Sequence, residues 1–269
     1  ALVMQTIAGH DTCDSTSLPD PVPDYTQAFT PGLQGIRLGI PREYYTDGIE
    51  PGVRQALLTA VDTLKDLGAE VKEVSLPHTR YAIPVYYLVL FAEASSNLAR
   101  FDSVRFGLSV PDDPEDYLER YLQTRQQGFG DEVKRRIMLG TFTLSAGYYD
   151  AYYLRAQRVR ALIRQDFLNA FQEVDALVTP VCPTTAFRIG EKVADPLQMY
   201  LSDIHVVAAN PAGIPGLAVP CGFSDAEPLA MPVGMQLLGK HLDEGTLLRI
   251  GHAYQQVTDW HLRQPPLAL

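Results

Sequence analysis

The sequence predicts an α/β protein in which a mixed central sheet is covered by helices. A strand–helix–strand pattern occupies residues 36–75, and a mostly helical segment with few β-branched runs occupies residues 80–145. Three further short apolar runs, at residues 175–179, 217–219 and 233–238, have the composition of buried strands. Strands and helices therefore alternate along the chain, as in α/β proteins.

The first unit has clear boundaries. Residues 36–40 form a strand pattern that Pro41 ends, and Pro51 begins a helix at a position that proline favours. Gly68 ends this helix, and residues 69–74 form a second strand pattern. The apolar residues of the helix recur at steps of three and four: Val53, Leu57, Ala60, Leu64 and Leu67. We expect the two strands to be parallel, with a right-handed crossover.

The later elements follow the same patterns. Residues 145–174 form the strongest helical pattern of the chain. Its tyrosine-rich beginning could line a pocket, but we expect it to lie in the core. The runs at 217–219 and 233–238 favour a hairpin. Asp243 caps a final helix that continues to Val257.

The beginning of the chain is unusual. Residues 1–8 look like the inside of a helix, with no capping residue before them and Gly9 at the position of a C-terminal cap. A turn-rich connector with four prolines follows at residues 11–35. A chain that begins inside a helix suggests a fragment.

Composition excludes several classes of protein. The 22 Lys and Arg residues against 32 Asp and Glu residues give a formal net charge of −10, which disfavours polyphosphate binding over most of the surface. Cys13, Cys182 and Cys221 are too few and too scattered for a disulfide framework, so we expect a reducing, cytoplasmic compartment. The apolar stretch at residues 81–94 is short for a membrane span and contains Pro84, so we expect no membrane association.

Several catalytic motifs are missing from the sequence. It has no Gly-x-Ser-x-Gly nucleophile elbow, no Gly-x-Gly-x-x-Gly after the first strand and no phosphate-binding loop that ends in Gly-Lys-Ser or Gly-Lys-Thr. His10, Cys13 and Asp14 are close together, but no second cluster has metal-ligand spacing. We interpret these three as turn residues, and we expect neither a metal nor a cofactor in this chain.

Two charged residues and one loop each have two interpretations. Arg136 belongs to a charged run that is normally a solvated helix face, yet an arginine there can also clamp a carboxylate. Asp203 precedes an apolar run, so it is either a helix N-cap or a counterion for an ammonium group. The Gly- and Pro-rich residues 210–216 indicate a tight loop or a place where a ligand approaches the backbone closely.

Six stretches carry a family resemblance: residues 93–102, 134–142, 144–153, 200–203, 210–222 and 231–236, together with the Thr258-Asp259-Trp260-His261 ending. The chain resembles the A subunits of glutamyl-tRNA(Gln) amidotransferases, a group within the amidase-signature family. The stretches at 93–102 and 134–142 are specific to these subunits, and the later ones are shared with other amidases. The resemblance implies the amidase-signature fold, with residues 1–269 as the C-terminal portion of a single domain whose N-terminal part is missing.

The family's catalytic residues have no counterpart here. Its Ser-Ser-Lys triad uses two serines in a Gly-Gly-Ser-Ser-Gly-Gly type of loop and a lysine upstream, whereas Ser95 and Ser96 lie between Ala94 and Asn97 without flanking glycines. We therefore assign no catalytic residue in this chain. What remains resembles a glutamine-binding wall, in which Arg136 matches the arginine that holds the α-carboxylate, Asp203 the acid that pairs with the α-ammonium, and Tyr87 a tyrosine that lines the pocket.

The resemblance also implies a function. In a heterotrimeric, cytoplasmic ligase complex, this chain would take part in glutamine hydrolysis and so supply ammonia to a B subunit, which uses ATP and Mg to amidate Glu-tRNA(Gln), or Asp-tRNA(Asn), in protein biosynthesis. A small C subunit completes the complex, and the tRNA would be bound through the B subunit. The alternatives are a stand-alone amidase of the same family and, since the triad is missing, an inactive binding or assembly fragment.

Overall fold

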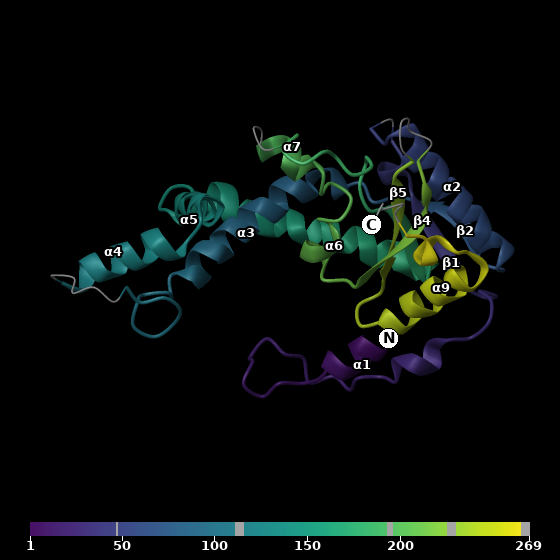
Figure 1. Ribbon diagram of the computed structural model, residues 1–269, viewed down its shortest axis with the longest axis horizontal. Helices are drawn as coiled ribbons and strands as arrows, with labels where there is room; N and C mark the ends of the chain where they lie inside the picture. Colours follow the sequence, from purple (N-terminus) through teal and green to yellow (C-terminus); the bar gives the residue numbers. More distant parts are fainter. Residues whose placement is uncertain (47, 111–115, 193–195, 225–229, 265–269) are drawn as a thin grey trace. The chain divides into compact units, whose positions relative to one another are not determined.

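The computed structural model describes residues 1–269 except residues 47, 111–115, 193–195, 225–229 and 265–269 (Figure 1). The chain divides into two compact units. The sheet unit consists of Ala1–Arg80 and Ile163–Leu269, and the helical unit is Tyr81–Leu162.

The sheet unit is built on a mixed sheet with the strand order β2-β1-β3-β5-β4 over the described residues. Its strands are β1 (Arg37–Pro41), β2 (Glu70–Val74), β3 (Ala176–Pro180), β4 (Gly216–Phe223) and β5 (Pro232–Gly239). β1 is parallel to β2 and β3, whereas β5 is antiparallel to β3 and β4. The predicted mixed sheet and the hairpin of β4 and β5 are thus confirmed.

Two helices pack their apolar sides into the main hydrophobic core of this sheet (Figure 1). They are α2 (Pro51–Asp66), which begins with the expected proline, and α9 (Glu244–Val257), whose N-cap Asp243 accepts a hydrogen bond from the Thr246 amide. Leu57 of α2 and Ile250 of α9 are fully buried. The burial of such side chains stabilises the unit by about 1.5–3 kcal/mol each. The strand–helix–strand unit expected at residues 36–75 consists of β1, α2 and β2.

The rest of the sheet unit is shorter helices and the end of a long one. The helices are α1 (Leu2–Ile7), α6 (Arg155–Glu173, which enters this unit at Ile163), α7 (Pro196–Leu201) and α8 (Ala209–Ala212). Single turns of 3-10 helix lie at Tyr25–Ala28, Arg42–Tyr44 and Trp260–Leu262, and a fourth, Thr79–Tyr81, spans the point in the sequence where the helical unit begins. α1 ends at Ile7, its C-cap residue Ala8 is extended, and Gly9 lacks the positive φ of a left-handed cap, so Gly9 is not the C-terminal cap that the sequence suggested.

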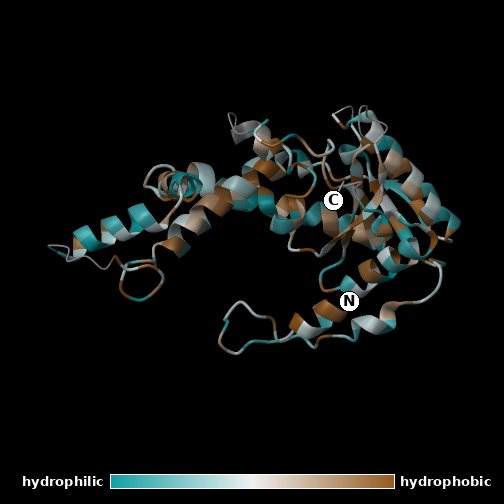
Figure 2. Ribbon diagram, viewed as in Figure 1, coloured by the Kyte–Doolittle hydropathy of each residue, from teal (hydrophilic) through white to brown (hydrophobic). Residues whose placement is uncertain are grey.

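The helical unit contains α3 (Ala82–Leu98), α4 (Tyr117–Gly128), α5 (Asp131–Leu144) and a π-helical turn at Tyr149–Leu154. α3 is largely hydrophobic and α4 mostly hydrophilic (Figure 2). α5 packs directly on α3, because Gly140 has no side chain: a Cβ there would lie 1.8 Å from the Phe91 carbonyl oxygen. Ser95 Oγ and Thr141 Oγ1 add a hydrogen bond of 3.0 Å across the same contact.

One prediction for this region is wrong. The helix expected from residue 145 begins only after turns at residues 145–148 and the π-helical turn. Its tyrosines were expected in the core, but Tyr149 is 39% and Tyr152 41% exposed. A helical period shows that one side is apolar, but it does not show whether that side is covered. In the part of the chain that the structure describes, no helix combines the length and hydropathy that crossing a membrane requires.

Candidate functional site

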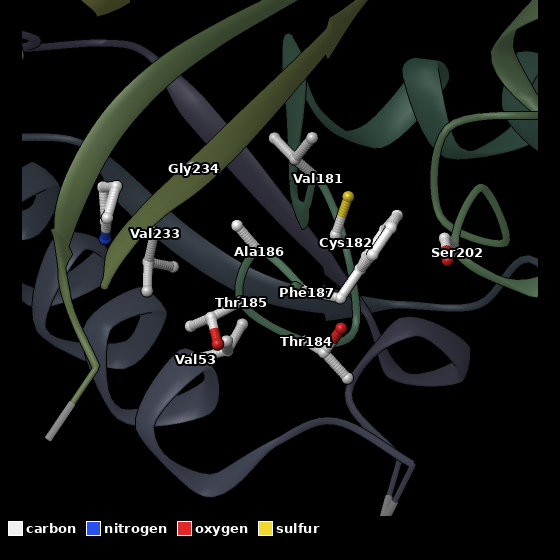
Figure 3. Close-up of a pocket in the computed structure, with 11 residues that line it drawn as sticks. Val53, Val181, Cys182, Thr184, Thr185, Ala186, Phe187, Ser202, Val233 and Gly234 are labelled. Carbon is white, nitrogen blue, oxygen red and sulfur yellow. The ribbon is translucent and has the colours of Figure 1, made fainter. Parts of the chain in front are cut away.

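A cavity of about 240 Å³ opens at one edge of the sheet (Figure 3). The carboxyl ends of the parallel strands β1 and β3 meet at this edge, and the antiparallel strand β5 begins there. Carboxyl ends of parallel strands are common places for ligand sites. The lining residues come from α2, the loop after β3, the segment after α7 and the start of β5: Val53, Val181, Cys182, Thr184, Thr185, Ala186, Phe187, Ser202, Pro232, Val233 and Gly234.

The loop after β3 is fixed against the start of α2. The Glu50 amide donates to the Pro183 carbonyl at 2.8 Å. In return, the Glu50 carboxylate accepts hydrogen bonds from the Thr185 amide at 2.9 Å and the Thr185 hydroxyl at 3.2 Å. These reciprocal bonds hold the loop that forms one wall of the cavity.

Charged groups lie at the side of the cavity that Ser202 forms. Lys192 Nζ donates to Ser202 Oγ at 2.8 Å and lies 4.3 Å from the centre of the Phe187 ring. Burial raises the pKa of the Cys182 thiol, the negative charge of Asp203 raises it further, and Lys192 opposes them. The thiol is therefore protonated at neutral pH and is not an activated nucleophile.

Asp203 is not a helix cap, so that interpretation of the sequence is wrong. Residues 202–208 form consecutive turns, and the next helix, α8, has Ala208 at its N-cap position. The Asp203 carbonyl accepts hydrogen bonds from the amides of Val206 at 2.9 Å and Val207 at 3.1 Å. The second interpretation, a counterion for an ammonium group, stays a prediction.

A buried polar group connects this turn to the sheet. Gln236 Nε2 donates to Thr179 Oγ1 at 2.9 Å and to the His205 carbonyl at 3.1 Å. These residues were not predicted from the sequence as possible contributors to a site, although Gln236 belongs to one of the stretches that carry the resemblance. The signal was weak, because a single glutamine in an apolar strand does not reveal its acceptors.

The other two predicted site residues lie in the helical unit. Arg136, on α5, donates from Nε to Glu132 Oε1 at 2.9 Å, and Arg135 pairs with the same carboxylate. Tyr87, on α3, is 9% exposed and packs its ring against Phe91, with 5.4 Å between the ring centres. The structure thus places Arg136 and Tyr87 on two helices that pack together, and Asp203 in the sheet unit. Their joint role in one glutamine site stays a prediction.

Two further interpretations can be compared with the structure. Gly213 ends α8 in the left-handed conformation, with φ of 70°, and β4 begins at Gly216. The tight-loop interpretation of residues 210–216 is therefore sufficient to explain their composition. Within the described ranges, no three or more His, Cys, Asp and Glu side chains are grouped so that they could hold a metal ion.

Comparison with known proteins identifies the class. The profile of the amidase family matches residues 1–248, and the chain belongs to this family. The chain is 59% identical, over 268 residues, to the A subunit of the glutamyl-tRNA(Gln) amidotransferase from Chloroflexus aggregans, and the match covers 100% of this chain and 54% of that protein. The chain thus spans about half the length of the curated relatives it matches.

Solved structures agree with this. The crystal structure of the A subunit of the glutamyl-tRNA(Gln) amidotransferase from Thermotoga maritima has a TM-score of 0.73 and 38% identity, over 96% of this chain and 50% of that one. The peptide amidase of Stenotrophomonas maltophilia has a TM-score of 0.67 and 26% identity, over 98% and 52% of the two chains. The amidase-signature fold expected from the sequence is confirmed.

Proposed function

We propose that this chain is part of the glutamine-hydrolysing subunit of a tRNA-dependent amidotransferase and carries residues that recognise glutamine. The observation that supports this most strongly is the 59% identity to such a subunit over 100% of the chain. The subunit-specific stretch around Arg136 belongs to this matched region.

Arg136 would bind the α-carboxylate of glutamine. A guanidinium offers several N–H groups in a planar fork, which matches the two oxygens of a carboxylate. Glu132 accepts the Nε–H at 2.9 Å and so fixes the orientation of the fork. An arginine oriented in this way loses less conformational entropy when a substrate carboxylate binds.

Asp203 would bind the α-ammonium, and Tyr87 would line the pocket. Free glutamine carries one carboxylate and one ammonium, so a selective site needs one cation and one anion at matched places. Amides without these charged groups would make neither of the two contacts, which is how such a site would discriminate against them. The turn that holds the Asp203 carbonyl and the lysine contact of its neighbour Ser202 support a defined position for this residue.

The nucleophile would come from residues outside this chain. In the proposed reaction a serine Oγ attacks the side-chain amide carbon of glutamine, the C–N bond breaks, and ammonia leaves while a glutamyl ester forms on the serine. Water then hydrolyses the ester to glutamate. The ammonia would pass to a B subunit that uses ATP and Mg to activate Glu-tRNA(Gln) or Asp-tRNA(Asn), with a small C subunit in the same complex. The net charge of −10 fits tRNA contact mainly through that partner.

A stand-alone amidase is the second candidate, because the chain also resembles a peptide amidase in structure. The experiment is to express the complete reading frame, confirm its length by intact mass, and compare ammonia release from glutamine with that from simple aliphatic and aryl amides. We expect a strong preference for glutamine. A preference for aryl amides would favour the second candidate, and a reading frame that begins at Ala1 would leave only a binding or assembly module.

A further inference from the structure

We propose that Gln236 is a positioning residue, which ties the backbone of the Asp203 turn to the central sheet and so determines the KM for glutamine. This inference rests on the proposed function of Asp203. All the residues concerned belong to the sheet unit.

Gln236 lies on β5, an interior strand of the sheet. It is paired in register with Thr179 on β3 and Ala218 on β4. Its side chain is buried, with 7% of the residue exposed, and Thr179 is fully buried. β5 forms ladder hydrogen bonds with β3 on one side and β4 on the other, so the backbone that carries the Gln236 side chain is rigid.

The amide nitrogen of Gln236 reaches two acceptors at once. Nε2 donates to Thr179 Oγ1 at 2.9 Å and to the His205 carbonyl at 3.1 Å. A primary amide nitrogen has two protons, so each bond can use one of them. The bond to Thr179 stays within the sheet, whereas the bond to the His205 carbonyl connects β5 directly to the backbone of residue 205.

The held carbonyl belongs to the turn that begins at Asp203. The Asp203 carbonyl accepts hydrogen bonds from the Val206 and Val207 amides, and these bonds close the turn around residue 205. Among the described residues, the ring of His205 adds no hydrogen bond through Nδ1, which is buried without a partner, and the ring packs on Tyr44 with 5.6 Å between centres. The His205 side chain therefore contributes packing, whereas the hydrogen bond from Gln236 to the His205 carbonyl fixes the orientation of the turn.

The orientation of Asp203 matters because its carboxylate would pair with the ammonium group of glutamine. A charge-assisted hydrogen bond weakens when its donor and acceptor move apart or out of line. Because Asp203 would act on the ammonium of bound glutamine and on no reacting bond, we expect loosening of its turn to raise KM and to leave kcat nearly unchanged. A purely structural role of Gln236 predicts lower stability with no such split.

The test uses the protein from its complete reading frame, in three variants. Gln236→Met keeps the volume and removes both donors, and Gln236→Leu removes them with a second apolar side chain. Thr179→Val is the matched control, because it also removes a buried hydrogen bond of Gln236 but leaves the one to His205. Two measurements are made: hydrogen–deuterium exchange at the amides of Val206 and Val207, and the kinetics of glutamine hydrolysis.

We expect slow exchange at both amides in the wild type, faster exchange in the two Gln236 variants, and little change in Thr179→Val. We expect KM for glutamine to rise roughly 10-fold in the Gln236 variants, as for the weakening of one hydrogen bond to a charged group, with kcat within about twofold. Fast exchange of these amides in the wild type would overturn the proposal even if the variants fail to fold. So would unchanged exchange in folded Gln236 variants.

Asp203→Asn separates this inference from the proposed function. If Asp203→Asn raises KM but the Gln236 variants do not, although exchange is faster, the positioning role is wrong. If neither change affects KM while exchange is faster in the Gln236 variants, the proposed role of Asp203 in glutamine binding is wrong instead, and the tie between Gln236 and the turn is purely structural.

Discussion

The Arg37 guanidinium and the Asp175 carboxylate join the beginnings of β1 and β3 across 138 positions of sequence. Nη2 and Nε of Arg37 donate to the two carboxylate oxygens at 2.8 and 3.1 Å, and the Arg37 amide adds a third bond at 3.0 Å. Lys240, at the end of β5, donates to the same carboxylate at 3.2 Å. One aspartate therefore connects three strands of the sheet.

This arrangement predicts a pH dependence of stability. Hydrogen bonds from Arg37 and Lys240 hold the pKa of Asp175 well below its usual range. The folded state thus binds the proton less readily than the unfolded chain, whose Asp pKa is about 3.9, so this contribution is complete above about pH 5 and is lost as the pH falls through the folded pKa. Asp175→Asn should lower the melting temperature at neutral pH and flatten its acid dependence.

The measurement is the thermal midpoint of wild type and variant at pH values from about 3 to about 7. Asp66→Asn, a change at an exposed aspartate at the end of α2, is the control and should follow the wild-type curve. Parallel curves for Asp175→Asn and the wild type would show that the carboxylate contributes no net stability.

Gly140 should tolerate no side chain. A Cβ at this position would lie 1.8 Å from the Phe91 carbonyl oxygen and 2.7 Å from Ser95 Cβ, so α5 has to move away from α3. Such overpacking costs about 1–3 kcal/mol or more, although alanine is by itself a better helix former than glycine. We expect Gly140→Ala to lower the urea midpoint, whereas Gly128→Ala, where the nearest atom is at 3.6 Å, should be neutral or stabilising. Equal midpoints for the two variants would contradict the close contact of α3 and α5.

The sequence was most informative where local signals agreed. Pro41, Pro51 and Gly68 mark the ends of elements that also show the right period, and β1, α2 and β2 lie there. The hairpin of β4 and β5 was predictable for the same reason. These signals depend on neighbours in sequence, which is all that a single sequence can show.

The helix-cap interpretation of Asp203 was wrong at a place where a distant residue contributes a hydrogen bond. An acid before an apolar run favours a helix start, in which the carbonyl of residue 205 would accept a bond from an amide four positions later. The His205 carbonyl instead accepts from Gln236, 31 positions away. Within the described part of the chain, the His205 carbonyl therefore does not take part in a helical hydrogen bond. The pattern of neighbouring residues in the sequence gives no sign of this long-range bond.

His205 should destabilise the protein as the pH falls. Burial lowers the pKa of its imidazole to about 4, so the folded state keeps it neutral while the unfolded chain takes up a proton near pH 6.5. Between about pH 6.5 and pH 4 the unfolded state binds more protons, and stability therefore decreases as the pH falls through this window. His205→Phe keeps a ring against Tyr44 and should remove this part of the pH dependence.

Chemical denaturation at several pH values in this window measures the effect. His241→Gln is the matched control, since His241 is exposed and its ring Nδ1 forms a hydrogen bond with the Gly213 carbonyl at the surface. If His241→Gln loses the pH dependence of stability and His205→Phe keeps it, the prediction for His205 is wrong and the dependence comes from His241.

Arg136 gives the most direct test of glutamine recognition in the helical unit. We expect Arg136→Ala, in the protein from its complete reading frame, to reduce kcat/KM for glutamine by the equivalent of roughly 2–5 kcal/mol, as when one partner of a buried charge pair is removed. Arg136→Lys should recover little, because an ammonium cannot make two parallel bonds to a carboxylate.

Arg135→Ala is the control. Arg135 is adjacent and pairs with the same Glu132 carboxylate, so this variant reproduces the loss of an ion pair on α5 without loss of the proposed clamp. If Arg135→Ala and Arg136→Ala reduce glutamine hydrolysis equally, the effect comes from α5 and not from recognition of the carboxylate. If Arg136→Ala leaves the kinetics unchanged, Arg136 does not belong to the glutamine site.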